Sequence, residues 1–76
     1  MSVLKQAQTE ANNLNLTDEL QKVVAGLENR RKLKGFKKIQ PETANTYEAR
    51  LTIKYRAFMV FDSDNVIIFH VGDHLR

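Results

Sequence analysis

The sequence contains no cysteine and no tryptophan, and it has one proline and three glycines among its 76 residues. The absence of cysteine excludes disulfides and thiolate sites and is typical of proteins in the reducing cytoplasm. No apolar run approaches the ~20 residues needed to span a bilayer, and the first residues lack the pattern of a signal peptide. We therefore expect a soluble, cytoplasmic protein that does not bind a membrane.

Several motifs of common catalytic and cofactor sites are also absent. There is no glycine-rich phosphate loop, no cluster of metal-ligand residues and no nucleophile elbow. His70 and His74 are four residues apart, but a strand does not bring such a pair onto one metal ion as a helix does. The sequence therefore predicts neither a metal nor another cofactor.

The charged residues are unevenly distributed. Residues 30–38 (RRKLKGFKK) hold six of the twelve lysines and arginines and no acid, whereas the rest of the chain holds six cations and nine acids. A phosphate backbone or an acidic protein would bind such a patch, although a solvated helix end and loop can have the same composition. With a hydrophobic fraction of 42%, the chain should fold as a single domain over residues 1–76.

The strongest pattern is an alternation between residues 47 and 61. Every odd position there is apolar or alanine, and the even positions are polar from Glu48 to Arg56 before they become apolar at Phe58. This period of two predicts β-structure. One straight strand would span roughly 50 Å, which is too long for so small a domain, so we expect the chain to fold back near residues 52–55.

The length of this loop decides where the arginines point, because directly opposed residues of antiparallel strands share a face. A two-residue loop would place Leu51 opposite Arg56 and mix apolar with charged side chains. A three-residue loop, residues 53–55, would place Arg50 opposite Phe58. We therefore predict the odd loop, with Arg50 and Arg56 on one face of the sheet and an apolar surface on the other.

Two helices are predicted before the strands. Residues 2–13 carry an apolar stripe at helical spacing that includes Val3 and Ala7, and a second stripe follows Thr17, the predicted N-cap. Both stripes need an apolar surface to cover, and the sheet offers one. With residues 66–71 as the last strand, the sequence predicts an α+β fold in which an N-terminal helical hairpin packs on a three-stranded antiparallel β-meander.

Arg50 and Arg56 are the first candidates for chemistry. Two guanidinium groups held on one face of a sheet can bind a phosphate and stabilise charge that develops on it. The ordinary alternative is that they are solvent-facing arginines paired with Glu48 or Asp73.

The two histidines are expected to differ in role. His70 falls on the core face of the last strand, together with Ile68, and is expected to be a half-buried structural residue, while Val71 falls on the arginine face. His74 follows a turn at Gly72, beyond the end of the strand. It is the better candidate for proton transfer, since an unperturbed histidine titrates near neutrality.

Three segments resemble the RelE/ParE superfamily of toxin–antitoxin proteins. They are KLKG at residues 32–35, YEARLTIKYRAFMVF at residues 47–61 and DNVIIFHVGDH at residues 64–74. The resemblance implies the RelE-like fold. It also implies the activity of the RelE branch, whose members cleave messenger RNA in the ribosomal decoding site without a metal ion and are restrained by an antitoxin.

The same resemblance implies roles for individual residues. Arg50 corresponds to a basic residue of the first motif strand, Arg56 to the phosphate-binding arginine of the YR pair, and His74 to a terminal histidine that serves as general acid or base. The side chains that would hold RNA are Arg31, Lys34, Lys37 and Lys38.

The sequence also departs from the family pattern. The usual first strand is apparently lacking, so residues 47–53 or 66–71 should form an open edge that pairs with a second copy of the chain or with an antitoxin strand. The aromatic residue that often closes the last motif is missing. No glutamate precedes the leucine–lysine pair, since Arg31 and Lys32 stand there. These departures leave an alternative function, a non-catalytic basic module that binds nucleic acid or a protein such as DNA gyrase.

Overall fold

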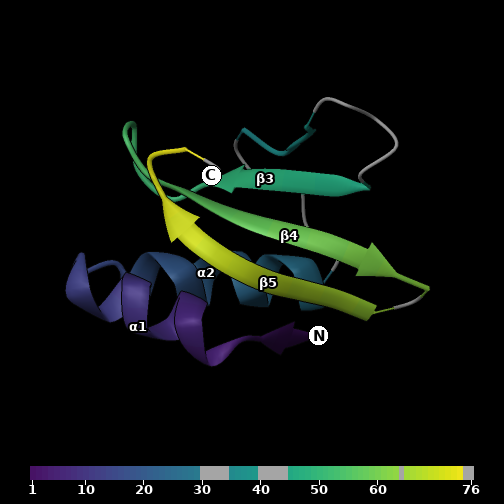
Figure 1. Ribbon diagram of the computed structural model, residues 1–76, viewed down its shortest axis with the longest axis horizontal. Coiled ribbons are helices and arrows are strands. Elements are labelled where there is room, and N and C mark those ends of the chain that lie inside the picture. The colour runs from purple at the N-terminus through teal and green to yellow at the C-terminus, as the bar shows by residue number, and fades with distance from the viewer. Residues whose placement is uncertain (30–34, 40–44, 64, 75–76) are drawn as a thin grey trace.

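The computed structural model describes residues 1–29, 35–39, 45–63 and 65–74. Its elements, in chain order, are β1 (Ser2–Val3), α1 (Lys5–Asn13), α2 (Thr17–Glu28), β2 (Lys37–Lys38), β3 (Thr46–Arg50), β4 (Arg56–Asp62) and β5 (Asn65–Gly72). The strands form one sheet in the order β1-β5-β4-β3-β2, and both helices lie on one side of it (Figure 1). The predicted α+β fold, a helical hairpin on the meander β3-β4-β5, is confirmed.

The core lies between the helices and the apolar face of the sheet. Ala7 and Ala11 of α1 are fully buried, as the predicted stripe requires. The other buried members of the core are Leu16, Leu20, Val23, Ala49, Ala57, Met59, Ile68 and Val71. Neither α1 nor α2, the helices of the described ranges, is long and apolar enough to cross a membrane.

The expectation that a first strand is lacking is wrong. Ser2 and Val3 pair in parallel with Ile67 and Ile68 of β5, and the Leu4 N–H donates to the Ile68 carbonyl at 2.9 Å. Helix α1 therefore begins at Lys5 and not at residue 2. The physical reason is that the outer edge of β5 carries backbone groups that need partners, and an extended segment supplies them where a helix cannot.

The other edge of the meander is covered as well. Lys37 and Lys38 of β2 pair antiparallel with Glu48 and Tyr47 of β3. The open edges predicted at residues 47–53 and 66–71 are thus each partly covered by a two-residue strand. The predicted N-cap at Thr17 is also wrong, because Leu16 holds the cap position of α2 and the Thr17 hydroxyl contacts the Asn12 amide oxygen at 2.6 Å.

The first hairpin has an odd loop, as predicted, but the loop is two residues longer. Arg50 pairs with Arg56, so residues 51–55 form the connection, and Glu48 rather than Arg50 lies opposite Phe58. The Leu51 N–H donates to the Tyr55 carbonyl at 2.9 Å, and the Tyr55 N–H donates to the Thr52 hydroxyl at 3.1 Å. These bonds satisfy the backbone of a turn that has no glycine. Because the loop is odd, Arg50 and Arg56 still share a face.

The pairing of β4 with β5 contains a bulge that the sequence pattern does not reveal. Met59 pairs with Ile68 and Phe58 pairs with His70, so Phe69 is an extra residue on β5. The bulge reverses the facing of the residues that follow it. Val71 is therefore buried in the core at 2% exposure, and the predictions that placed His70 in the core and Val71 on the arginine face are wrong.

Candidate functional site

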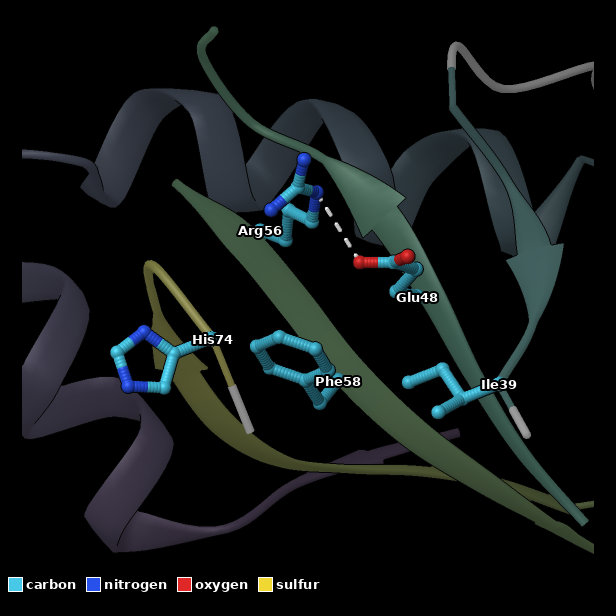
Figure 2. A pocket seen from close by; sticks show the side chains of 5 residues that line it. All are labelled: Ile39, Glu48, Arg56, Phe58 and His74. Carbon is cyan, nitrogen blue, oxygen red and sulfur yellow. Dashed lines mark ion pairs between the residues drawn. The ribbon is translucent and has the colours of Figure 1, made fainter. Parts of the chain in front are cut away.

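A pocket lies on the face of the sheet that points away from the helices. It is lined by Ile39, Glu48, Arg56, Phe58 and His74 and has a volume of about 300 Å³ (Figure 2). These residues come from the segment after β2, from β3, from β4 and from the segment after β5. Four separate parts of the chain thus meet at one site.

The floor of the pocket is apolar. Phe58 is only 2% exposed although it stands on the face opposite the helices. Its ring stacks on the His70 ring at a centroid distance of 5.4 Å and an interplanar angle of 22°. This stacking depends on the bulge at Phe69, which turns His70 toward Phe58. Charged groups at the rim are thus partly shielded from water, which strengthens their interactions.

Glu48 brings a carboxylate into the pocket and is itself 8% exposed. Its Oε2 lies 3.1 Å from Arg56 Nε, and its Oε1 lies 3.4 Å from Lys37 Nζ. Sequence reasoning treated Glu48 only as a partner of the arginines and missed it as a site residue. The available signal was its even position, which places it on the same face as Arg50 and Arg56.

Arg56 connects β4 to the segment that follows β5. Besides the contact with Glu48, its Nη1 donates to the Asp73 carbonyl at 3.1 Å. The side chain remains 32% exposed. A guanidinium has five N–H donors in a fixed plane, so these two contacts orient Arg56 and leave further donors for an anion that enters the pocket.

His74 lies beyond the end of β5 and lines the same pocket as Arg56. Its Nδ1 lies 3.0 Å from the Asp73 carboxylate, an acceptor that favours a proton on that nitrogen. The imidazole is 55% exposed. The sequence placed Arg56 and His74 among the catalytic candidates, and the fold brings the two into one site.

Arg50 lies beside the pocket rather than in it. It is exposed, shares a face with Arg56 through the direct cross-strand pairing, and is absent from the residues that line the pocket. Gly35, which has φ +63°, packs closely against it, since a Cβ on Gly35 would lie 2.9 Å from Arg50 Cβ.

The two described lysines of the basic patch point to different sides of the sheet. Lys37 pairs with Glu48 and contacts its carboxylate next to the pocket. Lys38 pairs with Tyr47, and its Nζ lies 5.8 Å from the centroid of the Tyr47 ring, which packs against the core. Arg31 and Lys34, the other predicted RNA-binding residues, lie outside the described residues.

No group of three or more histidine, aspartate or glutamate side chains within the described ranges is arranged to hold a metal ion.

Comparison with known proteins identifies relatives by structure only. No family model and no curated protein matches the sequence. A YoeB/ParE toxin from Agrobacterium tumefaciens superposes with a TM-score of 0.79 at 8% identity, covering 99% of this chain and 100% of that one. The YoeB–YefM toxin–antitoxin complex from Staphylococcus aureus gives 0.77 at 11% identity, with 97% and 94% covered.

A third similar structure is a copper-bound mutant toxin from Helicobacter pylori, with a TM-score of 0.76 at 18% identity and with 96% of this chain and 91% of that chain covered. In all three comparisons the two chains match over nearly their whole lengths, helices and sheet together. At these identities the likeness concerns the fold, and the resemblance seen in the sequence motifs points to the same group of proteins. This chain therefore has the fold of the YoeB and ParE toxins.

Proposed function

We propose that this chain is the toxin of a toxin–antitoxin pair and acts as an endoribonuclease that needs no metal ion. The observation that carries the proposal is the meeting of Glu48, Arg56 and His74 in one pocket. A carboxylate, a guanidinium and an imidazole are the groups that RNA cleavage by the 2′-hydroxyl requires as base, charge stabiliser and acid.

In this reaction the 2′-oxygen of a ribose attacks the adjacent phosphorus, and the bond from phosphorus to the 5′-oxygen of the next nucleotide breaks. The products are a 2′,3′-cyclic phosphate and a 5′-hydroxyl. Glu48 accepts the proton of the 2′-hydroxyl, and His74 donates a proton from Nε2 to the leaving 5′-oxygen. Arg56 stabilises the negative charge that develops on the phosphoryl oxygens.

The residues next to the pocket would guide the RNA backbone. Arg50 stands across from Arg56 on the same face, and Lys37 flanks Glu48. Both are exposed cations that can bind the phosphates on either side of the cleaved bond, which gives the binding its dependence on salt.

The proposed substrate is messenger RNA on the ribosome in the cytoplasm, in line with the motif resemblance to the RelE branch. The similarity to the Staphylococcus aureus toxin, which is bound to YefM, supports a partner antitoxin for this chain. A homodimer formed through an edge strand would have to pair β1 or β2, the outer strands of the described sheet.

The proposal is tested with purified protein and end-labelled RNA, in the presence of a chelator and with or without ribosomes. We expect fragments that end in a 2′,3′-cyclic phosphate, and no cleavage where the attacked nucleotide is replaced by its 2′-deoxy form. Arg56→Ala and His74→Ala should lower the cleavage rate by about 10²–10⁴-fold, while binding of the 2′-deoxy RNA falls less. Lys22→Gln, which changes an exposed cation of α2, is the control.

If the folded wild-type protein binds RNA or a protein target but cleaves neither free nor ribosome-bound RNA, the proposal is wrong. The alternative, a non-catalytic basic binding module, would then hold. The ion pair between Glu48 and Arg56 favours the non-catalytic alternative, because each group occupies the other instead of a substrate.

A further inference from the structure

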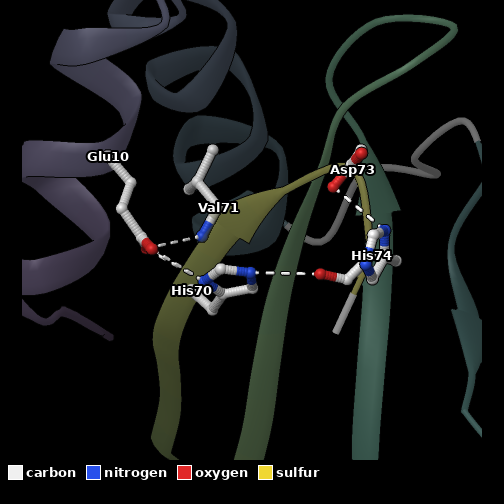
Figure 3. A network of polar contacts seen from close by, with 5 residues as sticks. All are labelled: Glu10, His70, Val71, Asp73 and His74. Atoms are coloured by element: carbon white, nitrogen blue, oxygen red, sulfur yellow. Dashed lines mark hydrogen bonds and ion pairs between the residues drawn. The ribbon is translucent and has the colours of Figure 1, made fainter. Parts of the chain in front are cut away.

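His70 lies outside the catalytic set proposed above, yet it connects α1 to the segment that carries His74 (Figure 3). The bulge at Phe69 takes the imidazole out of the core and places it against Phe58. Its side chain is 20% exposed, so its polar atoms are largely removed from water and depend on protein partners.

One side of the ring faces a carboxylate. His70 Nδ1 lies 2.9 Å from Glu10 Oε2 and 3.1 Å from Glu10 Oε1. The same Oε1 accepts the Val71 N–H at 3.0 Å. Glu10 therefore covers the edge of β5 where β1 no longer reaches, and it holds the imidazole from α1.

The other side of the ring faces the main chain of the site. His70 Nε2 lies 3.2 Å from the carbonyl oxygen of His74. The preceding carbonyl, that of Asp73, accepts a hydrogen bond from Arg56. Two successive carbonyls after β5 thus contact side chains of the sheet. Arg56 of β4 holds the Asp73 carbonyl, and His70 of β5 contacts the His74 carbonyl.

Both partners of the His70 ring are acceptors only. A neutral imidazole has one N–H group and can donate to one of them, whereas an imidazolium donates from both nitrogens. In the neutral ring with its proton toward Glu10, the lone pair of Nε2 would face the lone pairs of the His74 carbonyl. The observed geometry is therefore complete only when the His70–Glu10 pair holds the additional proton.

We propose that His70 is a positioning residue for His74. In its protonated form it bridges Glu10 and the His74 carbonyl, and it thereby holds the His74 imidazole at the pocket; on loss of the proton the bridge opens at the His74 carbonyl. The catalytic consequence rests on the function proposed above, but the bridge itself does not.

The charged and titratable groups near this ring come from three elements. They are Glu10 on α1, Arg56 on β4, and Asp73 and His74 after β5. Arg56 is near the ring because it lies on the same face of β4 as Phe58, two residues away. Because both groups are histidines, the pH profile of the cleavage rate alone does not separate them. The decisive measurement must observe each histidine by itself.

Nuclear magnetic resonance of the full chain, labelled with ¹³C and ¹⁵N, makes that separation between about pH 5 and pH 9, the range around the ordinary titration of histidine. We expect the carbonyl ¹³C shift of His74, and the backbone order at Asp73 and His74, to change together with the His70 ring ¹⁵N shifts. Unchanged His74 carbonyl and backbone signals while the His70 ring loses its proton would overturn the bridge.

Two variants break the bridge in different ways. His70→Gln removes the imidazole that gains and loses the proton. The carbonyl ¹³C shift of His74 should then lose the pH dependence that it shares with the His70 ring. Gly72→Ala leaves every charge in place but puts a Cβ 2.8 Å from His70 Nε2, so the end of the ring that contacts the His74 carbonyl must shift. Glu28→Gln, which changes an exposed carboxylate of α2 on the far side of the sheet, is the control.

In RNA cleavage, both variants should lower kcat by about 10–100-fold, as misplacement of a catalytic group by about 1 Å does, with little change in KM. An undiminished kcat in both variants would overturn the positioning role. If wild-type protein does not cleave RNA, the proposed function fails, and the carbonyl measurement still decides whether the bridge exists.

Discussion

Replacement of Glu48 by glutamine separates the catalytic from the non-catalytic interpretation of the pocket. Glutamine keeps the size of the side chain and an acceptor oxygen for Arg56, but it cannot accept the proton of a 2′-hydroxyl. Loss of a general base lowers the rate by about 10²–10⁴-fold, or roughly 3–5 kcal/mol of transition-state stabilisation. We therefore expect kcat for RNA cleavage to fall by that factor.

The effect of Glu48→Gln on folding should be much smaller. The contact with Arg56 is a charged hydrogen bond at 3.1 Å in a site where Glu48 is nearly buried and Arg56 is 32% exposed. The contact with Lys37 involves a lysine that is 68% exposed and is worth at most about 1 kcal/mol. With an acceptor oxygen retained, we expect a loss of about 1–2 kcal/mol, equivalent to a decrease of roughly 5–15 °C in Tm.

The direction in which Glu48→Gln changes the affinity for RNA distinguishes the two interpretations. Without the Glu48 carboxylate, Arg56 and Lys37 are no longer neutralised, so a 2′-deoxy RNA that cannot be cleaved should bind at least as tightly as before. The assay combines single-turnover cleavage, binding of the 2′-deoxy RNA and thermal unfolding, with Glu28→Gln as the matched control. A cleavage rate that falls only in proportion to the folded fraction would refute the role of Glu48 as base.

Three further outcomes are expected. Lys37→Gln should reduce the slope of log Kobs against log salt for single-stranded RNA by roughly 0.7, the value for one phosphate contact; Lys38→Gln, on the other side of the sheet, should leave it unchanged, and equal effects would contradict the assigned facing. Leu4→Pro should cost about 1 kcal/mol in denaturant unfolding, because it removes the N–H that donates to Ile68 while the local φ of −66° suits proline; no loss would mean that the pairing of β1 contributes little. Ile68→Ala, in the fully buried centre of the core, should cost about 2–5 kcal/mol, and a loss below about 1 kcal/mol in the same assay would contradict that burial.

The sequence predicted the parts of the fold that repeat a pattern over many residues. The alternation from residue 47 to residue 61 was sufficient for two strands and an odd loop, because a shift by one residue would have mixed apolar and charged side chains. It could not fix the loop length, since three and five residues give the same facing. Ser2–Val3 and Lys37–Lys38 are too short to show a period, and they become strands only because a neighbouring strand has an unpaired edge.

The site was less predictable than the fold. Four successive apolar residues, from Val66 to Phe69, hide the point at which β5 gains its extra residue, so the facing of His70 could not be read from the sequence. The even position of Glu48 predicted its face of the sheet. Its place in a pocket could not be predicted, because the pocket forms where His74 and Ile39 come close to it from other parts of the chain. Arg56 was found from the alternation, and His74 from its place beyond the turn at Gly72, and the motif resemblance agreed with both. Arg50 was expected to share a phosphate with Arg56, but it does not line the pocket.

Under the function proposed above, the direct pairing of Arg50 with Arg56 makes the folding of this hairpin depend on polyanions. Like charges directly opposite each other destabilise an antiparallel pair, and of these two arginines it is Arg56 that forms an ion pair with Glu48. An anion that binds beside both arginines removes this repulsion, and any ligand bound only by the folded chain stabilises it, by about 2.7 kcal/mol at a hundredfold excess over Kd. Residues 51–55 should therefore close more readily in a solution of RNA than in buffer. Under the function proposed above, the isolated chain is therefore less stable than the chain bound to RNA.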